Sequence, residues 1–68
     1  MDPLVESLTW KRKQLRMSRE DVGRKVGVSG AAVATWERSE RDVPLSKLRK
    51  WATALGVTFI VTEIRGDL

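Results

Sequence analysis

The sequence predicts a mainly α fold, in which four short helices are followed by one C-terminal β-strand. Apolar residues recur at helical spacing in four stretches, and Pro, Gly or a capping Ser or Asp stands at the ends of these stretches. After Gly56 the composition changes to VTFIVTEI, in which six of eight residues are β-branched and a seventh is Phe59. This density of β-branched residues favours a strand over a further helix.

The first helix is expected from about Pro3 to about Arg16. Asp2 is a suitable N-cap, and Pro is favoured at the first helical position because its backbone angle already suits a helix. Its apolar residues at helical spacing are Leu4, Val5, Leu8 and Leu15.

The second and third helices are both expected to begin at a capping serine. Ser18 followed by Asp21 resembles a capping box, with Asp in place of the usual Glu, and the helix that starts there ends at Gly27. Its inward residues are Val22 and Val26. Ser29 can cap a third helix, after which a polar loop leads to Pro44. The third helix holds mostly small residues, namely Ala31, Ala32, Val33 and Ala34, together with Trp36.

The fourth helix is expected to start near Pro44 or Leu45 and to stop at Gly56. It places Trp51 beside a stripe of apolar residues formed by Leu45, Leu48, Ala52 and Leu55. Trp36 and Trp51 both lie on core stripes, so we expect them to be buried and Trp10 to be exposed.

The predicted strand at residues 57–64 needs a partner, because a lone strand leaves its backbone groups unpaired. The simplest partner is the same strand of a second copy, paired antiparallel about a two-fold axis. The dimer interface would then contain Val57, Phe59, Ile60, Val61 and Ile64. Two alternatives stay open: a helix, which residues 57, 60, 61 and 64 also fit, and a segment that packs on its own domain.

Composition narrows the classes of function. The chain has 68 residues, enough for one domain, and it has neither Cys nor His. We therefore expect no disulfide, metal site or cofactor, and no enzyme, since no nucleophile–base arrangement is available. No stretch is long enough for a membrane helix, and no basic flank precedes an apolar stretch at the N-terminus, so an intracellular protein without membrane contact is expected.

The charge distribution points to an acidic partner. The formal net charge is +4, which favours phosphate backbones or acidic surfaces. Basic residues cluster around the end of the first helix and the start of the second, at Lys11, Arg12, Lys13, Arg16 and Arg19. Charge alone leaves an ordinary solvated helix face as an equal alternative.

The run from Arg19 to Arg38 has the spacing of a helix-turn-helix. Gly23 and Gly27 stand where two helices must touch and turn. The apolar residues that close one short helix over the other are Val22, Val26, Val28, Val33 and Trp36. That geometry leaves the second helix, about Ser29 to Arg38, free to enter the major groove of DNA.

The stretch from Leu8 to Gly56 resembles the Cro/C1-type (XRE) helix-turn-helix family of bacterial and phage regulators. The matching features are Arg12, MSREDVGRKVGVS at residues 17–29, WER at residues 36–38, Pro44, and LRKWATALG at residues 48–56. The resemblance implies a four-helix, lambda-repressor-like DNA-binding domain at residues 1–56. The dimerisation strand expected at residues 57–64 lies beyond the matching stretch and rests on composition alone.

The resemblance also implies roles for individual residues. Arg12 and Glu37 would form a structural ion pair, with two unrelated surface charges as the alternative. Arg19 stands where many relatives carry Gln and would contact a phosphate or, as the alternative, a guanine edge. Ser39 replaces the family's Gly, which puts the left-handed turn there in doubt. The expected DNA-binding residues are Ser18, Arg19, Ser29, Gly30, Ala31, Ala34, Thr35, Arg38 and Arg41, with Lys47 as an additional phosphate contact.

The expected function is that of a transcriptional regulator that binds double-stranded DNA. It would be a repressor acting as a homodimer on a palindromic operator, in the cytoplasm, at a bacterial nucleoid or in a phage-infected host. Because the recognition face has few side chains that pair with bases, operator choice would depend largely on DNA shape and half-site spacing. The alternatives are an antitoxin that binds a toxin protein and regulates its own operon, and a helix face that packs on another protein.

Overall fold

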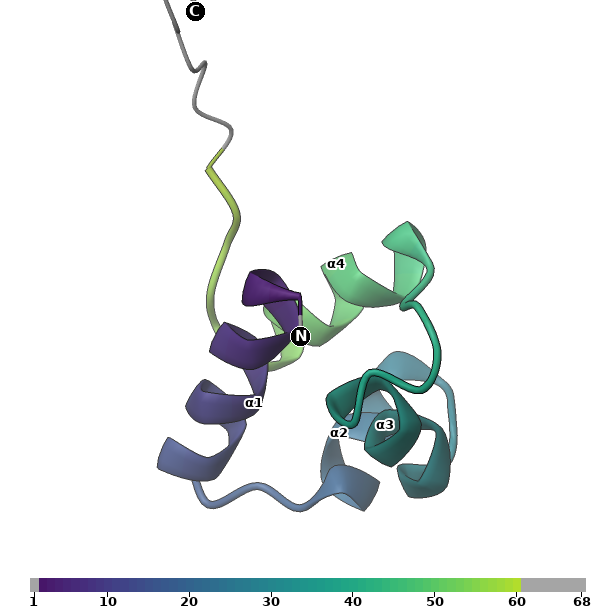
Figure 1. Cartoon of the computed structure of the whole chain (residues 1–68). Helices are drawn as coiled ribbons and strands as arrows, with labels where there is room; N and C mark the ends of the chain where they lie inside the picture. The colour runs from purple at the N-terminus through teal and green to yellow at the C-terminus, as the bar shows by residue number, and fades with distance from the viewer. Residues whose placement is uncertain (1, 61–68) are drawn as a thin grey trace, which may run out of the picture.

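The computed structural model describes residues 2–60 of the chain. It contains four α-helices in this range, namely α1 at Pro3–Gln14, α2 at Arg19–Val26, α3 at Gly30–Glu37 and α4 at Leu45–Ala54 (Figure 1). α2 and α3 pack against each other as a pair, α4 packs on α2, and α1 contacts α3 from the other side. The prediction of a mainly helical domain is confirmed. None of the described helices is long and apolar enough to cross a membrane.

The predicted starts of α1, α2 and α3 are confirmed by their capping hydrogen bonds, and α4 begins at Leu45 as predicted, without a side-chain cap. Asp2 accepts a hydrogen bond from the backbone N–H of Leu4 at 2.8 Å, with Pro3 following as the first helical residue. Ser18 and Asp21 form both bonds of a capping box at the start of α2. Ser29 caps α3 by accepting a hydrogen bond from the N–H of Ala32 at 3.1 Å. Each bond satisfies a backbone donor that the helix itself leaves free.

The helices end in left-handed residues, only some of which are glycine. Gly27 (φ 90°) and Gly56 (φ 72°) take this conformation without a steric penalty. Arg16 (φ 58°) and Ser39 (φ 59°) also adopt it, so the left-handed turn at Ser39 forms without the family's glycine. The prediction that the first helix reaches Arg16 is wrong. α1 ends at Gln14 because Arg16 reverses the chain and directs the N–H of the next residue back to a carbonyl of the last turn.

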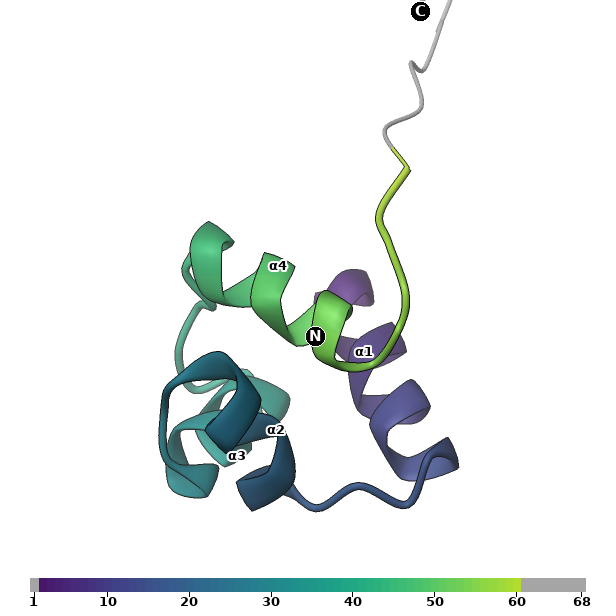
Figure 2. The ribbon, with the colours of Figure 1, turned by 180° about the vertical axis from the view of Figure 1, so that it is seen from behind.

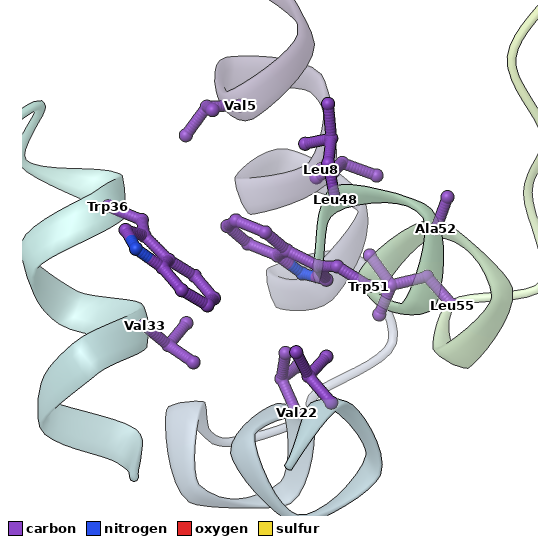
Figure 3. Close-up of a cluster of buried hydrophobic side chains, with 10 residues drawn as sticks. Val5, Leu8, Val22, Val33, Trp36, Leu48, Trp51, Ala52 and Leu55 are labelled. Carbon is purple, nitrogen blue, oxygen red and sulfur yellow. The ribbon is translucent and has the colours of Figure 1, made fainter. Parts of the chain in front are cut away.

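The core is built around two stacked indoles from different helices (Figure 3). Trp51 of α4 is fully buried and Trp36 of α3 nearly so, with ring centroids 5.9 Å apart and planes inclined by 33°. The burial of both rings and the exposure of Trp10, at 63%, agree with the prediction. Around the indoles lie apolar side chains from all four helices, namely Val5, Leu8, Val22, Val26, Val33, Leu48, Ala52 and Leu55.

Three residues predicted on the apolar stripes lie largely outside the core. Leu45 is 61% exposed, and Leu4 and Leu15 are each 44% exposed. Leu4 and Leu45 occupy the first turns of their helices, and Leu15 follows the last helical residue of α1. Helical spacing alone did not distinguish these residues at helix ends from the buried ones in the middle of each helix.

The described part of the predicted strand, residues 57–60, is neither helix nor strand in this single chain. It leaves α4 and runs beside α1, as both views of the ribbon show (Figure 1, Figure 2). Val57 and Phe59 pack against the core, whereas Thr58 is exposed and Ile60 is 84% exposed. The alternative of a helix is wrong for these residues. Val61 and Ile64, the other residues assigned to a dimer interface, lie outside the described residues.

Candidate nucleic-acid interface

The turn between α2 and α3 is held by backbone hydrogen bonds to Gly23, a residue within α2. The carbonyl of Gly23 accepts hydrogen bonds from the N–H groups of Gly27 at 2.7 Å and Val28 at 2.9 Å. A Cβ atom at Gly23 would lie only 2.5 Å from the carbonyl oxygen of Val28. Glycine at position 23 therefore allows α2 and α3 to pack more closely than any larger residue would allow.

The expected ion pair between Arg12 and Glu37 forms, and it is buried. Arg12 Nε donates to Glu37 Oε2 at 2.7 Å and Arg12 Nη2 donates to Glu37 Oε1 at 3.0 Å, an arrangement with two parallel bonds. Arg12 Nη1 also donates to the carbonyl oxygen of Met17 at 2.9 Å. The side chains are 9% and 3% exposed. The pair therefore joins α1, the loop after it and the end of α3.

Arg19 is a second partner of the same carboxylate, which sequence reasoning missed. Its Nε donates to Glu37 Oε1 at 2.9 Å, while its side chain remains 43% exposed. The two residues are 18 positions apart, and no local spacing rule connects them. Because only Nε takes part in a hydrogen bond within residues 2–60, the exposed Nη groups of Arg19 can still donate to a phosphate.

Two opposing effects set the ionisation of Glu37. Burial raises its pKa, but the hydrogen bonds and positive charges of Arg12 and Arg19 outweigh burial, so the pKa lies below its ordinary value of 4.5. Glu37 is consequently ionised at neutral pH, which the ion-pair geometry requires.

The exposed face of α3 is smaller than the sequence indicated. Ala31 is exposed, and Gly30 and Thr35 are half-buried. Ala34 was expected on the exposed face, but it is 8% exposed and belongs to the buried side. The reason is that α3 contacts both α1 and α2, so the buried part of this helix is wider than a single stripe.

The hydroxyl groups of Ser29, the N-cap, and of Thr35 in α3 each make one hydrogen bond to the backbone of the helix. Ser29 Oγ accepts the capping bond from Ala32, and Thr35 Oγ1 donates to the carbonyl oxygen of Ala32 at 2.7 Å. Arg38, at the end of α3, is exposed and forms two hydrogen bonds with Glu40, at 3.0 Å and 3.1 Å. This pairing raises the pKa of the Arg38 guanidinium and lowers that of Glu40.

The remaining predicted DNA contacts surround the α2–α3 pair. Ser18 is exposed at the start of α2, and its hydroxyl hydrogen is not used by the capping box. Arg41 is exposed in the loop between α3 and α4. The amino group of Lys47 lies 3.8 Å from the position that a Cβ of Gly27 would take, so Lys47 stands beside the helix-turn-helix turn. These residues add hydrogen-bond donors at the start of α2, in the loop after α3 and beside the turn between α2 and α3.

Within residues 2–60 the side chains form no cluster of three or more His, Cys, Asp or Glu residues that could hold a metal ion. The start of α3 is partly exposed, because Ser29 and Ala31 are exposed and Gly30 is half-buried. A short helix with an exposed start is the kind of element that enters the major groove of a duplex.

Comparison with known proteins supports this reading of the architecture. A family model described as helix-turn-helix matches residues 8–61. The chain is similar to the P22 c2 repressor protein, solved in complex with the synthetic operator 9T in the presence of Tl+, with a TM-score of 0.75 and 31% sequence identity. The similarity covers 85% of this chain and 88% of that one. A search of curated proteins found no match.

The family match extends over α2, α3 and α4 and most of α1, and the solved structure agrees with it in fold over nearly the whole length of both chains. The sequence features that suggested the resemblance lie in these same helices. The chain belongs to the Cro/C1-type (XRE) helix-turn-helix family.

Proposed function

We propose that this chain is a transcriptional repressor that binds double-stranded DNA as a homodimer on a palindromic operator. The observation that carries the proposal is the similarity in fold and sequence to a repressor protein that was solved on an operator. In the proposed complex the N-terminal half of α3 enters the major groove, as the recognition helix of a helix-turn-helix does.

The electrostatics of the candidate interface support this mode of binding. Arg19, Arg38 and Arg41 are at least partly exposed around α3 and offer charged donors to phosphates on both sides of a groove. Ser18 adds a hydroxyl donor at the start of α2. Contacts of this kind set the register of the protein on the duplex, while base edges supply the sequence preference.

The recognition surface itself favours a limited set of direct base contacts. Ala31 offers a methyl group that can contact thymine methyls. With Ala34 buried, fewer groups remain for reading bases than the sequence suggested, and the hydroxyls of Ser29 and Thr35 each already make one hydrogen bond within the chain. Much of the operator preference is therefore assigned to DNA shape and to the spacing of two half-sites.

The segment at residues 57–60 supports dimerisation through the C-terminal strand. Its side chains alternate, with Val57 and Phe59 on the core and Ile60 outward, which is the pattern of an extended strand. An apolar groove of about 880 Å³ lies between this segment and α1, and a second of about 620 Å³ lies between it and α4. The exposed residues Leu4 and Ile60 line both grooves, while Trp10 lines the first and Leu45 the second. The same segment of a second copy would cover them.

Selection from random duplexes, followed by titration of the recovered site, tests DNA binding and its symmetry. We expect a two-fold symmetric site bound by two chains, and the DNA next to the chain's own gene is a second target for footprinting. Failure to enrich any duplex would overturn the proposal. A second protein that co-purifies in fixed ratio with the chain and releases it from DNA would favour an antitoxin instead.

Light scattering of the full chain tests the dimer. Ile60→Asp should shift the population towards monomer, because a charge in an interface strand cannot be buried without a partner. Ser46→Asp, which adds the same charge at an exposed position in the first turn of α4, is the matched control and should leave the mass unchanged. An Ile60→Asp chain that remains fully dimeric would contradict the proposed interface.

A further inference from the structure

Glu20 occupies space that the first residue of the recognition helix leaves empty. α3 begins with Gly30, which has no side chain. If a Cβ atom were present at Gly30, it would lie 2.8 Å from Glu20 Cδ, 2.8 Å from Glu20 Oε1 and 2.9 Å from Glu20 Cγ. The carboxylate of α2 therefore stands where a side chain of α3 would otherwise begin.

This carboxylate differs from the others of the helix-turn-helix in being free. Asp21 is held by Ser18 and Arg24, Glu37 by Arg12 and Arg19, and Glu40 by Arg38. Glu20 belongs to none of the ion pairs among the described residues, and it is exposed. Its oxygen atoms remain available as hydrogen-bond acceptors for another molecule.

The recognition helix itself offers few acceptors next to Glu20. Ser29 Oγ already accepts a bond from Ala32, and Ala31 ends in a methyl group. The Glu20 carboxylate is thus an acceptor beside a helix that has few of its own. Its effect on base preference is therefore larger than it would be beside a recognition helix rich in Gln and Asn.

We propose that Glu20 is a specificity-determining residue of the DNA interface, whose carboxylate accepts a hydrogen bond from the N4 amino group of cytosine. The inference rests on the proposed function, because it requires the N-terminus of α3 to enter the major groove. Cytosine is favoured because a carboxylate can only accept, and N4 is the donor that cytosine presents there. Adenine also presents an amino group, but its neighbouring N7 is an acceptor that would repel the second carboxylate oxygen.

Glycine at position 30 is part of this arrangement. Any larger residue there would meet the Glu20 carboxylate within 3 Å and displace it, which the flexible, exposed side chain permits. Glu20 and Gly30 thus act together in the recognition of one base pair. Glu20 of α2 supplies the carboxylate, and Gly30 of α3 leaves the space that this carboxylate occupies.

The test compares the base preferences of the full-length wild type with those of Glu20→Gln and Glu20→Ala, by selection from random duplexes and titration of single-base variants. We expect the wild type to prefer C·G at one position of each half-site by about tenfold, the scale of a specific base contact. Glu20→Ala should lose this preference. Glu20→Gln should change it towards A·T, because an amide can both donate to N7 and accept from N6 of adenine.

Two controls separate base reading from general effects. Ser46→Lys raises the net charge by one, as Glu20→Gln does, at an exposed position in the first turn of α4, and it should leave every base preference unchanged. Gly30→Ala keeps Glu20 but takes its space, and it should weaken the same C·G preference. Thermal unfolding of each variant verifies that it is folded at the binding temperature.

The outcomes separate the two proposals. If the wild type selects no duplex, the proposed function fails. If the wild type selects a site and the Glu20 variants keep the same base preferences, only the role of Glu20 is overturned. The same holds if these variants bind every sequence more tightly by the same factor, since the charge of Glu20 then merely repels phosphates.

Discussion

At the scale of single residues, Glu37 connects three separate parts of the chain. Its carboxylate is 3% exposed and accepts hydrogen bonds from Arg12 of α1 and Arg19 of α2. Two guanidinium groups around one carboxylate leave one positive charge in excess. The half-exposed Arg19 keeps that excess in contact with solvent, so the buried pair of Arg12 and Glu37 is neutral.

Arg12 and Arg19 should therefore differ in their effect on stability. Arg12→Ala is expected to lower the free energy of unfolding by about 3–5 kcal/mol, because it removes the buried partner of a buried carboxylate. Arg19→Ala should lower it by less than about 1 kcal/mol, since a partly exposed ion pair is screened by water. Urea unfolding monitored by tryptophan fluorescence measures both values. Equal losses would contradict this division of roles.

The depressed pKa of Glu37 predicts loss of stability in acid. The unfolded chain binds a proton at Glu37 near pH 4.5, whereas the folded chain does so only at lower pH. The stabilisation is thus fully present above pH 4.5 and falls as the pH is lowered through the folded pKa. NMR titration of the Glu37 side-chain carboxyl carbon, together with unfolding between pH 7 and pH 3, checks this. A midpoint above 4.5 would refute it.

Ser39 lies in a backbone conformation that favours glycine. At φ 59° its Cβ is close to the following carbonyl, a strain that glycine lacks. Ser39→Gly should raise the free energy of unfolding by about 0.5–1 kcal/mol, measured by urea unfolding. The control is Ser46→Gly, inside the first turn of α4, which should lower it by a similar amount. A loss of stability in Ser39→Gly would show that the hydroxyl matters more than the strain.

At the scale of elements, the relative position of α2 and α3 depends on the backbone at Gly23. The carbonyl oxygen of Val28, which would meet a Cβ at 2.5 Å, belongs to the turn and cannot rotate away. At Gly30 the neighbouring atoms belong instead to the flexible side chain of Glu20. The two glycines therefore look alike in the sequence but differ in what a methyl group would displace.

Alanine at these two positions should have opposite effects. Gly23→Ala should lower the melting temperature, because widening the helix-turn-helix joint outweighs the gain of about 1 kcal/mol in helix propensity. Gly30→Ala should keep or raise it, since Glu20 can move aside. Differential scanning calorimetry compares the two variants directly. A Gly23→Ala chain as stable as Gly30→Ala would mean that the turn adjusts at little cost.

At the scale of the whole molecule, the position of the basic residues matters more than the net charge of +4. Arg41 lies in the loop that follows the recognition helix, whereas Arg49 lies on α4 beside the C-terminal segment. Both are exposed and carry the same charge, so they form a natural pair for comparison.

The salt dependence of DNA binding should distinguish these two arginines. Arg41→Ala should reduce the slope of log K against log salt concentration by about one, because each phosphate contact releases about 0.9 of a counterion. Arg49→Ala should leave the slope unchanged. Fluorescence anisotropy on the selected operator at four or more salt concentrations gives both slopes. Similar slopes for the two variants would mean that only the overall charge attracts DNA.

Local signals in the sequence determined most of the secondary structure. The capping residues Asp2, Ser18 and Ser29 and the terminal glycines marked the helix boundaries, because each acts on backbone groups within a few residues. The end of α1 at Gln14 was not predictable in this way, since the left-handed residue that follows it, Arg16, is not a glycine. The periodicity at residues 57–64 was likewise compatible with both strand and helix.

The sequence by itself therefore determined the order of the helices, their caps, the buried indoles of Trp36 and Trp51, and the resemblance that links Arg12 to Glu37. Only the tertiary structure decided that Ala34 is buried, that Arg19 binds Glu37, and that Glu20 lies against Gly30. The physical reason is distance along the chain. Caps and helical stripes depend on near neighbours, whereas these three features depend on how whole helices pack against one another.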